Sequence, residues 1–295
     1  MKIAKRVAVL LFLAGFSAAA QIKGTVKDSL SGKPIPYVNI WVANENIGTT
    51  SEENGEFTIT PTDKNKNLIF SVLGFEKKTV RALENMKVNL KPVAYQLDEV
   101  FVAPQRHETR EIEIGQTENK IYQAFDNGPR IDTKFFPYSA AYKKTKFIKQ
   151  VSIQTDSKIA DALIKIHFYS VDSNGFPGEE LIDKDYVVSV KKGVRKSFFN
   201  VTELNLIMPK KGLFVGFEKL IIERNKLEKT TTNLNTNKTE IQKTYFPFVL
   251  YNNVEREFLF TFSGGKWNKK TKKNSGAPLE KITISEPAIN LILTN

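Results

Sequence analysis

The chain has 295 residues, of which 41% are hydrophobic, and it carries a formal net charge of +12 with no cysteine. This length suits two domains better than one, and the lack of cysteine excludes disulfides and a lipid anchor on cysteine. The 21 phenylalanines and 9 tyrosines favour strands over helices. The basic excess fits simple solubility or acidic partners, whereas no recognition motif indicates nucleic-acid binding.

The N-terminus has the pattern of a secretory signal peptide. Residues 2–6 carry three positive charges, residues 7–16 are uncharged, and small residues at 18–20 form a cleavage pattern before Gln21. The apolar run is too short to span a bilayer, although an uncleaved anchor is the alternative. Removal of the leader leaves a charge of +9. We expect an exported protein, periplasmic or associated with the outer membrane, that is not a lipoprotein and has no transmembrane segment after cleavage.

Residues 21–102 alternate short apolar runs with polar turns. One run, Leu68–Phe75, is apolar except for Ser71 and is typical of a central strand. Strands at intervals of about 8–12 residues predict a small sandwich domain. The strands expected here cover residues 21–26, 37–42, 57–59, 68–75, 88–90 and 97–102.

The chain then becomes polar over residues 103–117, which we interpret as a linker. Ile121, Tyr122 and Phe125 follow at helical spacing, so a short helix is expected over residues 117–125.

The β pattern returns in a second domain, residues 118–295. Ile164, Ile166 and Phe168 share a parity and predict one core-facing side of a strand. Residues 225–244 are rich in Asn, Thr and Lys and predict an exposed loop or disordered insertion, and the basic tract 266–273 predicts a solvated loop. The fold class is therefore all-β, an N-terminal sandwich followed by a larger antiparallel, jelly-roll-like sandwich. The further strands expected cover residues 147–153, 187–190, 197–201, 213–222, 245–251, 258–262 and 282–293.

Several short motifs in residues 21–102 stand in an order that resembles a known family. They are Gly24-x-Val26-x-Asp28, Gly32-x-Pro34-Ile35-Pro36-x-Val38-x-Ile40, Gly48-Thr49-Thr50-Ser51, Gly55-x-Phe57-x-Ile59, Val72-x-Gly74-Phe75, Val88-x-Leu90 and Leu97-x-Glu99-Val100-x-Val102. Together they resemble the carboxypeptidase regulatory-like domain, and the resemblance implies a transthyretin-like sandwich of seven strands.

This family resemblance carries an expectation about context. In its best-known setting, the domain precedes the plug and barrel of TonB-dependent outer-membrane receptors. About 190 residues follow the domain here, too few for a plug and a large barrel. We therefore expect a free-standing exported protein in which a β accessory domain follows the regulatory-like domain.

The sequence gives no sign of an enzyme or a cofactor. A zinc peptidase needs a His-x-x-Glu pair, but Arg110 stands three residues after His107, and Ser170 three residues after His167. Both histidines are expected at the surface. No cysteine or Gly-x-Ser-x-Gly motif offers a nucleophile. A carboxylate-pair glycosidase stays open, because acids distant in sequence can meet in a fold.

Two small groups of residues are candidate sites. Tyr37 and Trp41 have the opposite parity to the apolar side of their strand, so they face a partner or a glycan, or are buried under an edge or against the second domain. Asp172 and Asn174 offer oxygen ligands to a weak calcium site, or form a hairpin turn.

These observations favour a non-catalytic module of the cell envelope that binds an outer-membrane or periplasmic protein. A glycan-binding accessory protein that uses its C-terminal sandwich is the alternative. An adaptor needs an apolar patch or a free strand edge, whereas a glycan binder needs aromatics clustered on a concave face.

Overall fold

The computed structural model describes residues 21–63, 65–93, 110–116, 121–124, 128–232, 239–255, 258–271 and 283–295. Within these ranges the protein is all-β, as predicted. Its helical segments are three short 3-10 turns, η1 (Ala140–Lys144), η2 (Thr202–Leu204) and η3 (Glu223–Asn225). The expected signal peptide, His107 and the strand expected at 97–102 lie outside the described residues.

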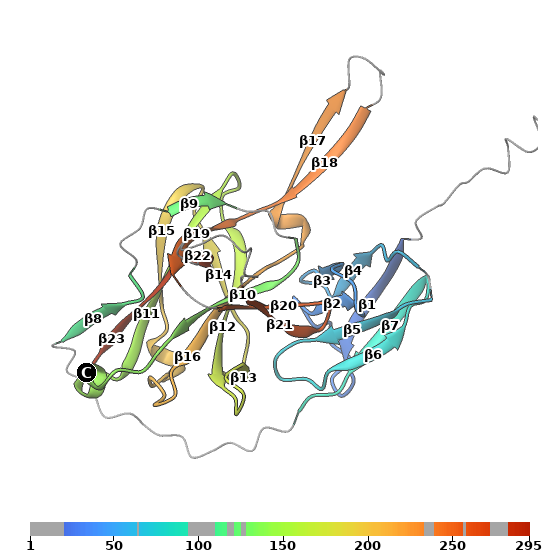
Figure 1. Ribbon diagram of the computed structural model, residues 1–295. Coiled ribbons are helices and arrows are strands. Elements are labelled where there is room, and N and C mark those ends of the chain that lie inside the picture. Colours follow the sequence, from blue (N-terminus) through green and yellow to red (C-terminus); the bar gives the residue numbers. More distant parts are fainter. Residues whose placement is uncertain are drawn as a thin grey trace, which may run out of the picture.

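The N-terminal domain is a sandwich of a three-stranded and a four-stranded sheet (Figure 1). The first sheet has the order β4-β1-β7, and the second has the order β3-β2-β5-β6. Alternation places Val26, Ile40, Phe70 and Leu90 in the shared core, where they are fully buried. The strands are β1 (Ile22–Asp28), β2 (Asn39–Val42), β3 (Gly48–Thr50), β4 (Glu56–Ile59), β5 (Asn67–Ser71), β6 (Lys78–Arg81) and β7 (Asn85–Leu90).

The C-terminal domain is a larger sandwich. The sheet that faces the N-terminal domain, here the junction sheet, has the order β13-β12-β16-β10-β20-β21, with β14 also paired to β12. Its strands are β10 (Ile131–Phe136), β12 (Ala162–Val171), β13 (Pro177–Glu180), β14 (Tyr186–Val190), β16 (Leu213–Lys219), β20 (Phe258–Ser263) and β21 (Lys266–Thr271).

The opposite sheet, here the distal sheet, has the order β22-β19-β11-β23-β8, with β15 paired to β11 and β9 paired to β19. Its strands are β8 (Glu111–Ile114), β9 (Ile121–Ala124), β11 (Phe147–Ser157), β15 (Gly193–Asn200), β19 (Phe248–Glu255), β22 (Thr283–Pro287) and β23 (Ile289–Thr294).

Burial of apolar side chains between the two sheets explains this packing. Ile164, Ile166 and Phe168 face this core, as predicted, and meet Val151 and Ile153 of the distal sheet. Because side chains alternate along a strand, Lys165 and His167 must lie on the other face of β12.

The loop expected at 225–244 is instead a hairpin, β17 (Lys226–Thr232) and β18 (Thr239–Tyr245), here called the arm. It projects away from both domains (Figure 1). The two strands pair with each other over seven positions, and the many threonines suit a strand. The predicted exposure is correct. The prediction of a loop or disordered insertion was wrong, because exposed strands have no buried apolar side that alternation could reveal.

Three other local predictions were also wrong. The helix expected at 117–125 contains β9, which pairs with β19, and the expected linker contains β8, which pairs with β23. The basic tract at 266–273 forms β21 as far as Thr271. For β8 and β9 the partner strand lies far away in sequence, and this pairing overrides the local pattern. Strand β21 instead forms a hairpin with β20, its neighbour in sequence.

Among the described residues, no helix is long and apolar enough to cross a membrane.

Candidate functional site: the junction between the two domains

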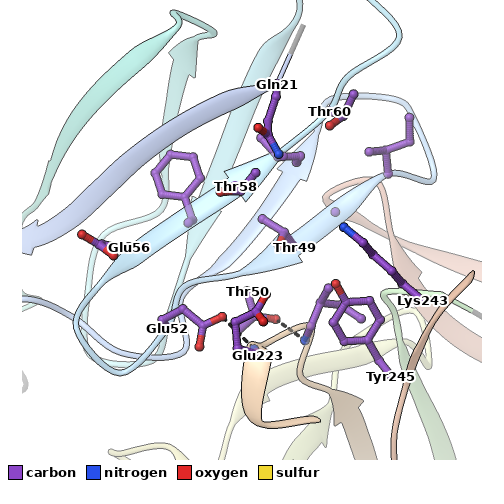
Figure 2. A pocket seen from close by; sticks show the side chains of 15 residues that line it. Gln21, Thr49, Thr50, Glu52, Glu56, Thr58, Thr60, Glu223, Lys243 and Tyr245 are labelled. Carbon is purple, nitrogen blue, oxygen red and sulfur yellow. Dashed lines mark hydrogen bonds between the residues drawn. The ribbon is translucent and has the colours of Figure 1, made fainter. Parts of the chain in front are cut away.

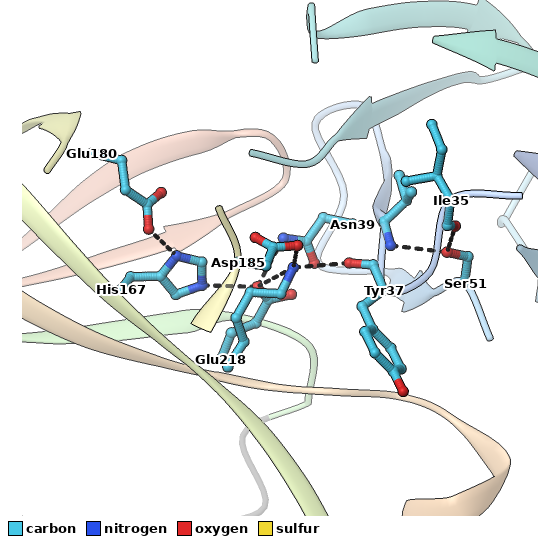
Figure 3. Close-up of polar contacts among 10 residues, drawn as sticks. Ile35, Tyr37, Asn39, Ser51, His167, Glu180, Asp185 and Glu218 are labelled. Carbon is cyan, nitrogen blue, oxygen red and sulfur yellow. Dashed lines mark hydrogen bonds and ion pairs between the residues drawn. The ribbon is translucent and has the colours of Figure 1, made fainter. Parts of the chain in front are cut away.

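The two domains meet across the outer face of the junction sheet. Cross-strand register sets Lys165 of β12 opposite Glu218 of β16, with His167 two residues further along β12. All three side chains are buried. The N-terminal domain covers them with β2 and the turn before it (Figure 3).

Direct polar contacts cross this boundary. The Lys165 ammonium donates to the Tyr37 carbonyl and to the Asp185 carboxylate, at 2.9 Å each. The Asn39 amide donates to Glu218 Oε2 at 2.9 Å. These bonds satisfy groups that burial would otherwise leave unpaired, so they stabilise the docked arrangement.

His167 lies between two carboxylates. Its Nδ1 is 2.7 Å from Glu180 Oε1, and its Nε2 is 3.0 Å from Glu218 Oε2. Burial disfavours the imidazolium, but the two carboxylates outweigh this effect and raise the pKa of His167 to about 10. His167 is therefore a cation that donates through both ring nitrogens.

The carboxylate of Glu218 is also held in its charged form. Burial favours the protonated acid, but Lys165 and His167 lower the pKa of Glu218 below its ordinary value. The junction thus contains a buried network in which each charge has a partner of opposite sign, here called the junction network. It comprises Asn39, Lys165, His167, Glu180, Asp185 and Glu218.

An aromatic contact supports the junction beside this network. Trp41 is 2% exposed, and its ring packs edge-on against Phe262 of β20 at a centroid distance of 6.1 Å. The turn between β20 and β21 reaches the N-terminal domain, where the Lys77 ammonium donates to the Gly265 carbonyl at 3.0 Å. The β20–β21 hairpin therefore connects the two domains.

A groove opens where the domains meet, with a volume of about 520 Å³ (Figure 2). Strands β3 and β4 form its N-terminal side. At its floor the amide of Ile221 donates to Thr50 and the amide of Glu223 donates to Glu52. The residues that line it are Gln21, Ile47, Gly48, Thr49, Thr50, Glu52, Glu56, Phe57, Thr58, Ile59, Thr60, Ile221, Glu223, Lys243 and Tyr245.

Two free strand edges border this groove. Among the described strands, β3 pairs only with β2, and β4 pairs only with β1. A free edge presents backbone donors and acceptors to any extended chain that approaches it. The groove therefore offers backbone pairing, hydroxyl groups and carboxylates together.

The first comparison with known proteins concerns the N-terminal domain. The family model of the CarboxypepD_reg-like domain matches residues 22–102. The N-terminal unit is a CarboxypepD_reg-like domain. A TonB-dependent receptor P3 of Formosa agariphila is 35% identical over 99 residues, which cover 32% of this chain and 10% of the receptor.

Similarity to solved structures is weak over the whole chain. The structure of infectious bursal disease virus, Gx strain, gives a TM-score of 0.25 at 10% identity and covers 93% of this chain and 60% of the viral chain. A DUF3823 family protein from Bacteroides ovatus gives 0.19 at 9% identity, over 79% of this chain and 96% of that protein. Both TM-scores are too low to indicate a shared overall fold.

The structure places the predicted contact residues of the CarboxypepD_reg-like domain at the junction. Tyr37 is half-buried against Leu163, Leu220 and Ile222 of the C-terminal domain. The side chain of Trp41 points out of the sandwich core, as its parity predicted, but the second domain covers it. Burial against that domain was the alternative, and it is what the structure shows.

The prediction of a surface His167 was also wrong. Its parity was correct, since it lies opposite Ile166 and Phe168, but the CarboxypepD_reg-like domain covers that face. The residue is 4% exposed. Alternation could indicate that Lys165, His167 and Glu218 face away from the core, but no sequence signal indicated that they would meet.

The predicted calcium turn forms the connection between β12 and β13. Asp172 Oδ1 accepts hydrogen bonds from the amides of Asn174 and Phe176, at 2.8 Å each. Within the described ranges, no group of three or more His, Asp or Glu side chains could hold a metal ion. The Asp172 carboxylate thus shapes a hairpin turn, with Gly175 at a positive φ of 78°.

A second buried polar cluster lies between the sheets of the C-terminal domain. Asp132 accepts hydrogen bonds from Tyr251 and Thr261, at 2.5 and 2.8 Å, and pairs with Arg130. Lys134 pairs with Glu286 at 3.2 Å. Because these charges have structural partners in the core, they fit a structural role.

Proposed function

We propose that this protein is a non-catalytic interaction module of the bacterial cell envelope, in which the junction groove binds an extended segment of another envelope protein. The pair of free edges, β3 and β4, carries this proposal, because extended peptides bind proteins by adding a strand to such an edge. The match to part of a TonB-dependent receptor supports an envelope setting, periplasmic or at the outer membrane.

The junction gives the groove a fixed shape. Residues from both domains line it, and the buried junction network holds those domains together. A binding site that is rigid before its partner arrives loses less entropy on binding. In this proposal the C-terminal domain acts as a permanent support for the CarboxypepD_reg-like domain.

The proposal is tested by site-specific photo-crosslinking in cells of the native host. A photoreactive residue replaces Thr58, which is exposed on β4 in the groove, or Leu83, which is exposed and does not line it. One dominant envelope protein cross-linked from position 58 and not from position 83 is expected. Thr58→Arg should reduce its capture in a pull-down, whereas Leu83→Arg should not.

A glycan-binding role is the second candidate, because hydroxyls, carboxylates and Tyr245 converge on the groove. Two results together would favour the glycan role over the adaptor role. The protein would be retained on cell-wall or capsular polysaccharide unless it carries Thr58→Arg, and no protein would be cross-linked from position 58.

A further inference from the structure

Another free strand edge lies on the distal sheet, on the side of the C-terminal domain away from the junction (Figure 1). Strand β15 pairs with β11 along its whole length, from Gly193 opposite Ser157 to Asn200 opposite Gln150. No other described strand pairs with β15. Its second side is therefore an open edge of eight residues, longer than β3 and β4.

Hydrogen bonds at the end of β15 show which of its residues direct their backbone N–H and C=O groups to the open edge. The amide of Val201 donates to the Lys149 carbonyl beside β11, whereas the carbonyl of Asn200 accepts from the Tyr186 hydroxyl at 2.7 Å. Backbone groups alternate in direction along a strand. The N–H and C=O groups of Val194, Lys196 and Phe198 therefore point away from β11.

The side chains of the same three residues are exposed. Val194 is 66% and Phe198 is 53% exposed, and both lie on one face with Lys196 between them. The Lys196 ammonium stands over the Phe198 ring at 5.2 Å from its centroid. Lysine alone on an edge protects it from unwanted pairing, but two large exposed apolar side chains do not fit a protected edge.

The charge around this edge is strongly positive. Lys191, Lys192 and Arg195 have no carboxylate partner among the described residues, and the Arg195 side chain donates only to the Lys192 carbonyl. Lys196 pairs with Glu113 at 2.6 Å. A hollow of about 500 Å³ lies here, lined by Lys191, Arg195, Lys196, Ser197 and Phe198. This composition is complementary to an acidic partner.

We propose that β15 is a docking edge for an acidic, extended segment of a partner protein, which adds as a strand alongside Val194–Phe198. In this arrangement the partner's backbone pairs with the outward N–H and C=O groups of β15. Its apolar side chains pack against Val194 and Phe198 across the new strand pair, and its carboxylates meet the cations around Arg195. The proposal goes beyond the groove and does not depend on it.

The test uses the full mature chain and a fluorescent peptide of about eight alternating Glu and Val residues, a typical strand length. Binding is measured by fluorescence anisotropy, and protection of the Val194, Lys196 and Phe198 amides by hydrogen exchange. The matched ligand control is the same peptide with N-methylated alternate amides, which keeps the charge but cannot pair. We expect binding of the unmodified peptide only, with those amides protected.

The matched variants separate backbone pairing from charge. Lys196→Pro removes the side chain and an outward N–H, whereas Lys196→Ala removes only the side chain. The Lys196→Pro variant should therefore bind the peptide about ten times more weakly than the Lys196→Ala variant. Thermal unfolding checks that both variants remain folded. Absence of binding overturns the proposal. Equal binding of the methylated peptide also overturns it. So do equal affinities of the Lys196→Pro and Lys196→Ala variants together with binding of the protein to phosphatidylglycerol vesicles. Either outcome indicates a surface that binds through charge alone.

Discussion

At the scale of single residues, the junction depends on charges that the sequence scatters widely. Lys165 and Glu218 stand opposite each other on neighbouring strands, while Asn39 comes from the other domain. Buried charges are stabilising in context only when all their partners are present, because removal of one partner leaves the others unpaired. Single substitutions in the junction network are therefore more harmful than surface substitutions.

His167→Gln is expected to lower the free energy of unfolding by about 3–5 kcal/mol, because Glu180 and Glu218 lose a buried cationic partner. Urea denaturation measures this change. Lys192→Gln is the matched control, since it removes an exposed cation with no described carboxylate partner, and it should change stability by less than about 0.5 kcal/mol.

The contribution of His167 should depend on pH. Its pKa is raised in the folded protein to about 10 from an ordinary value of 6.5, so the stabilisation is complete below pH 6.5 and is lost as the pH rises toward 10. The difference in unfolding free energy between the wild type and His167→Gln should therefore shrink across this interval. A difference that stays constant from pH 6 to pH 10 would contradict the ion-paired imidazolium.

Glycine matters where the β20–β21 turn meets the N-terminal domain. Gly265 has a φ of 83°, and a Cβ atom there would stand 2.6 Å from Ile69 Cδ1. Gly175 has a similar φ of 78°, but a Cβ atom there would meet nothing within 4 Å. A comparison of substitutions at Gly265 and Gly175 therefore separates the cost of backbone strain from the cost of a clash between the domains.

Both Gly265→Ala and Gly175→Ala should lose about 1–2 kcal/mol from backbone strain. Gly265→Ala should lose about 1 kcal/mol more, because Ile69 must shift to make room. Denaturation curves of the two variants provide the measurement, and equal losses would show that the turn does not press on Ile69 in solution.

At the scale of elements, the protein combines strands that build the cores with strands that do not. Its arm, β17 and β18, pairs with no other described strand, and most of its side chains are exposed. A two-stranded hairpin is only marginally stable alone in water. The arm therefore contributes little to the stability of either domain.

Replacement of residues 228–243 by Asn-Gly, a sequence that favours a tight hairpin turn, should leave the free energy of unfolding within about 0.5 kcal/mol of the wild type. Thermal and urea denaturation of the shortened protein measure this. Tyr245 stays in place, so the groove loses Lys243 alone among its lining residues. A large loss of stability would mean that the arm packs against the body of the protein.

At the scale of the whole molecule, the junction joins the two sandwiches through several kinds of contact. Polar bonds, the Trp41–Phe262 contact and the Lys77–Gly265 bond all cross it. Domains with an extensive shared interface are expected to unfold together, whereas domains on a loose linker unfold separately.

Calorimetry of the intact protein should accordingly show one unfolding transition. Trp41→Ala should separate it into two, because a large interface side chain is lost and its removal costs about 3–5 kcal/mol. Phe57→Leu, inside the N-terminal core, is the control: it should lower the transition temperature without splitting the transition. Two transitions in the wild type would contradict a rigid junction.

The sequence alone determined the positions of most strands, part of the core and the family of the N-terminal domain. Period-two alternation located most strands and placed Ile164, Ile166 and Phe168 in the core, because apolar side chains on one side of a strand must be buried. Turn residues and ordered motifs identified the CarboxypepD_reg-like domain. These features could be predicted because each depends on residues close together in the chain.

Only the tertiary structure decided what covers the second face of each strand. Alternation showed that Lys165, His167 and Trp41 point away from a core, but it does not distinguish solvent from another domain. The same limit hid β8 and β9, whose partners lie far away in sequence. The junction, its groove and the free edge of β15 follow from contacts between distant segments, and no local pattern encodes them.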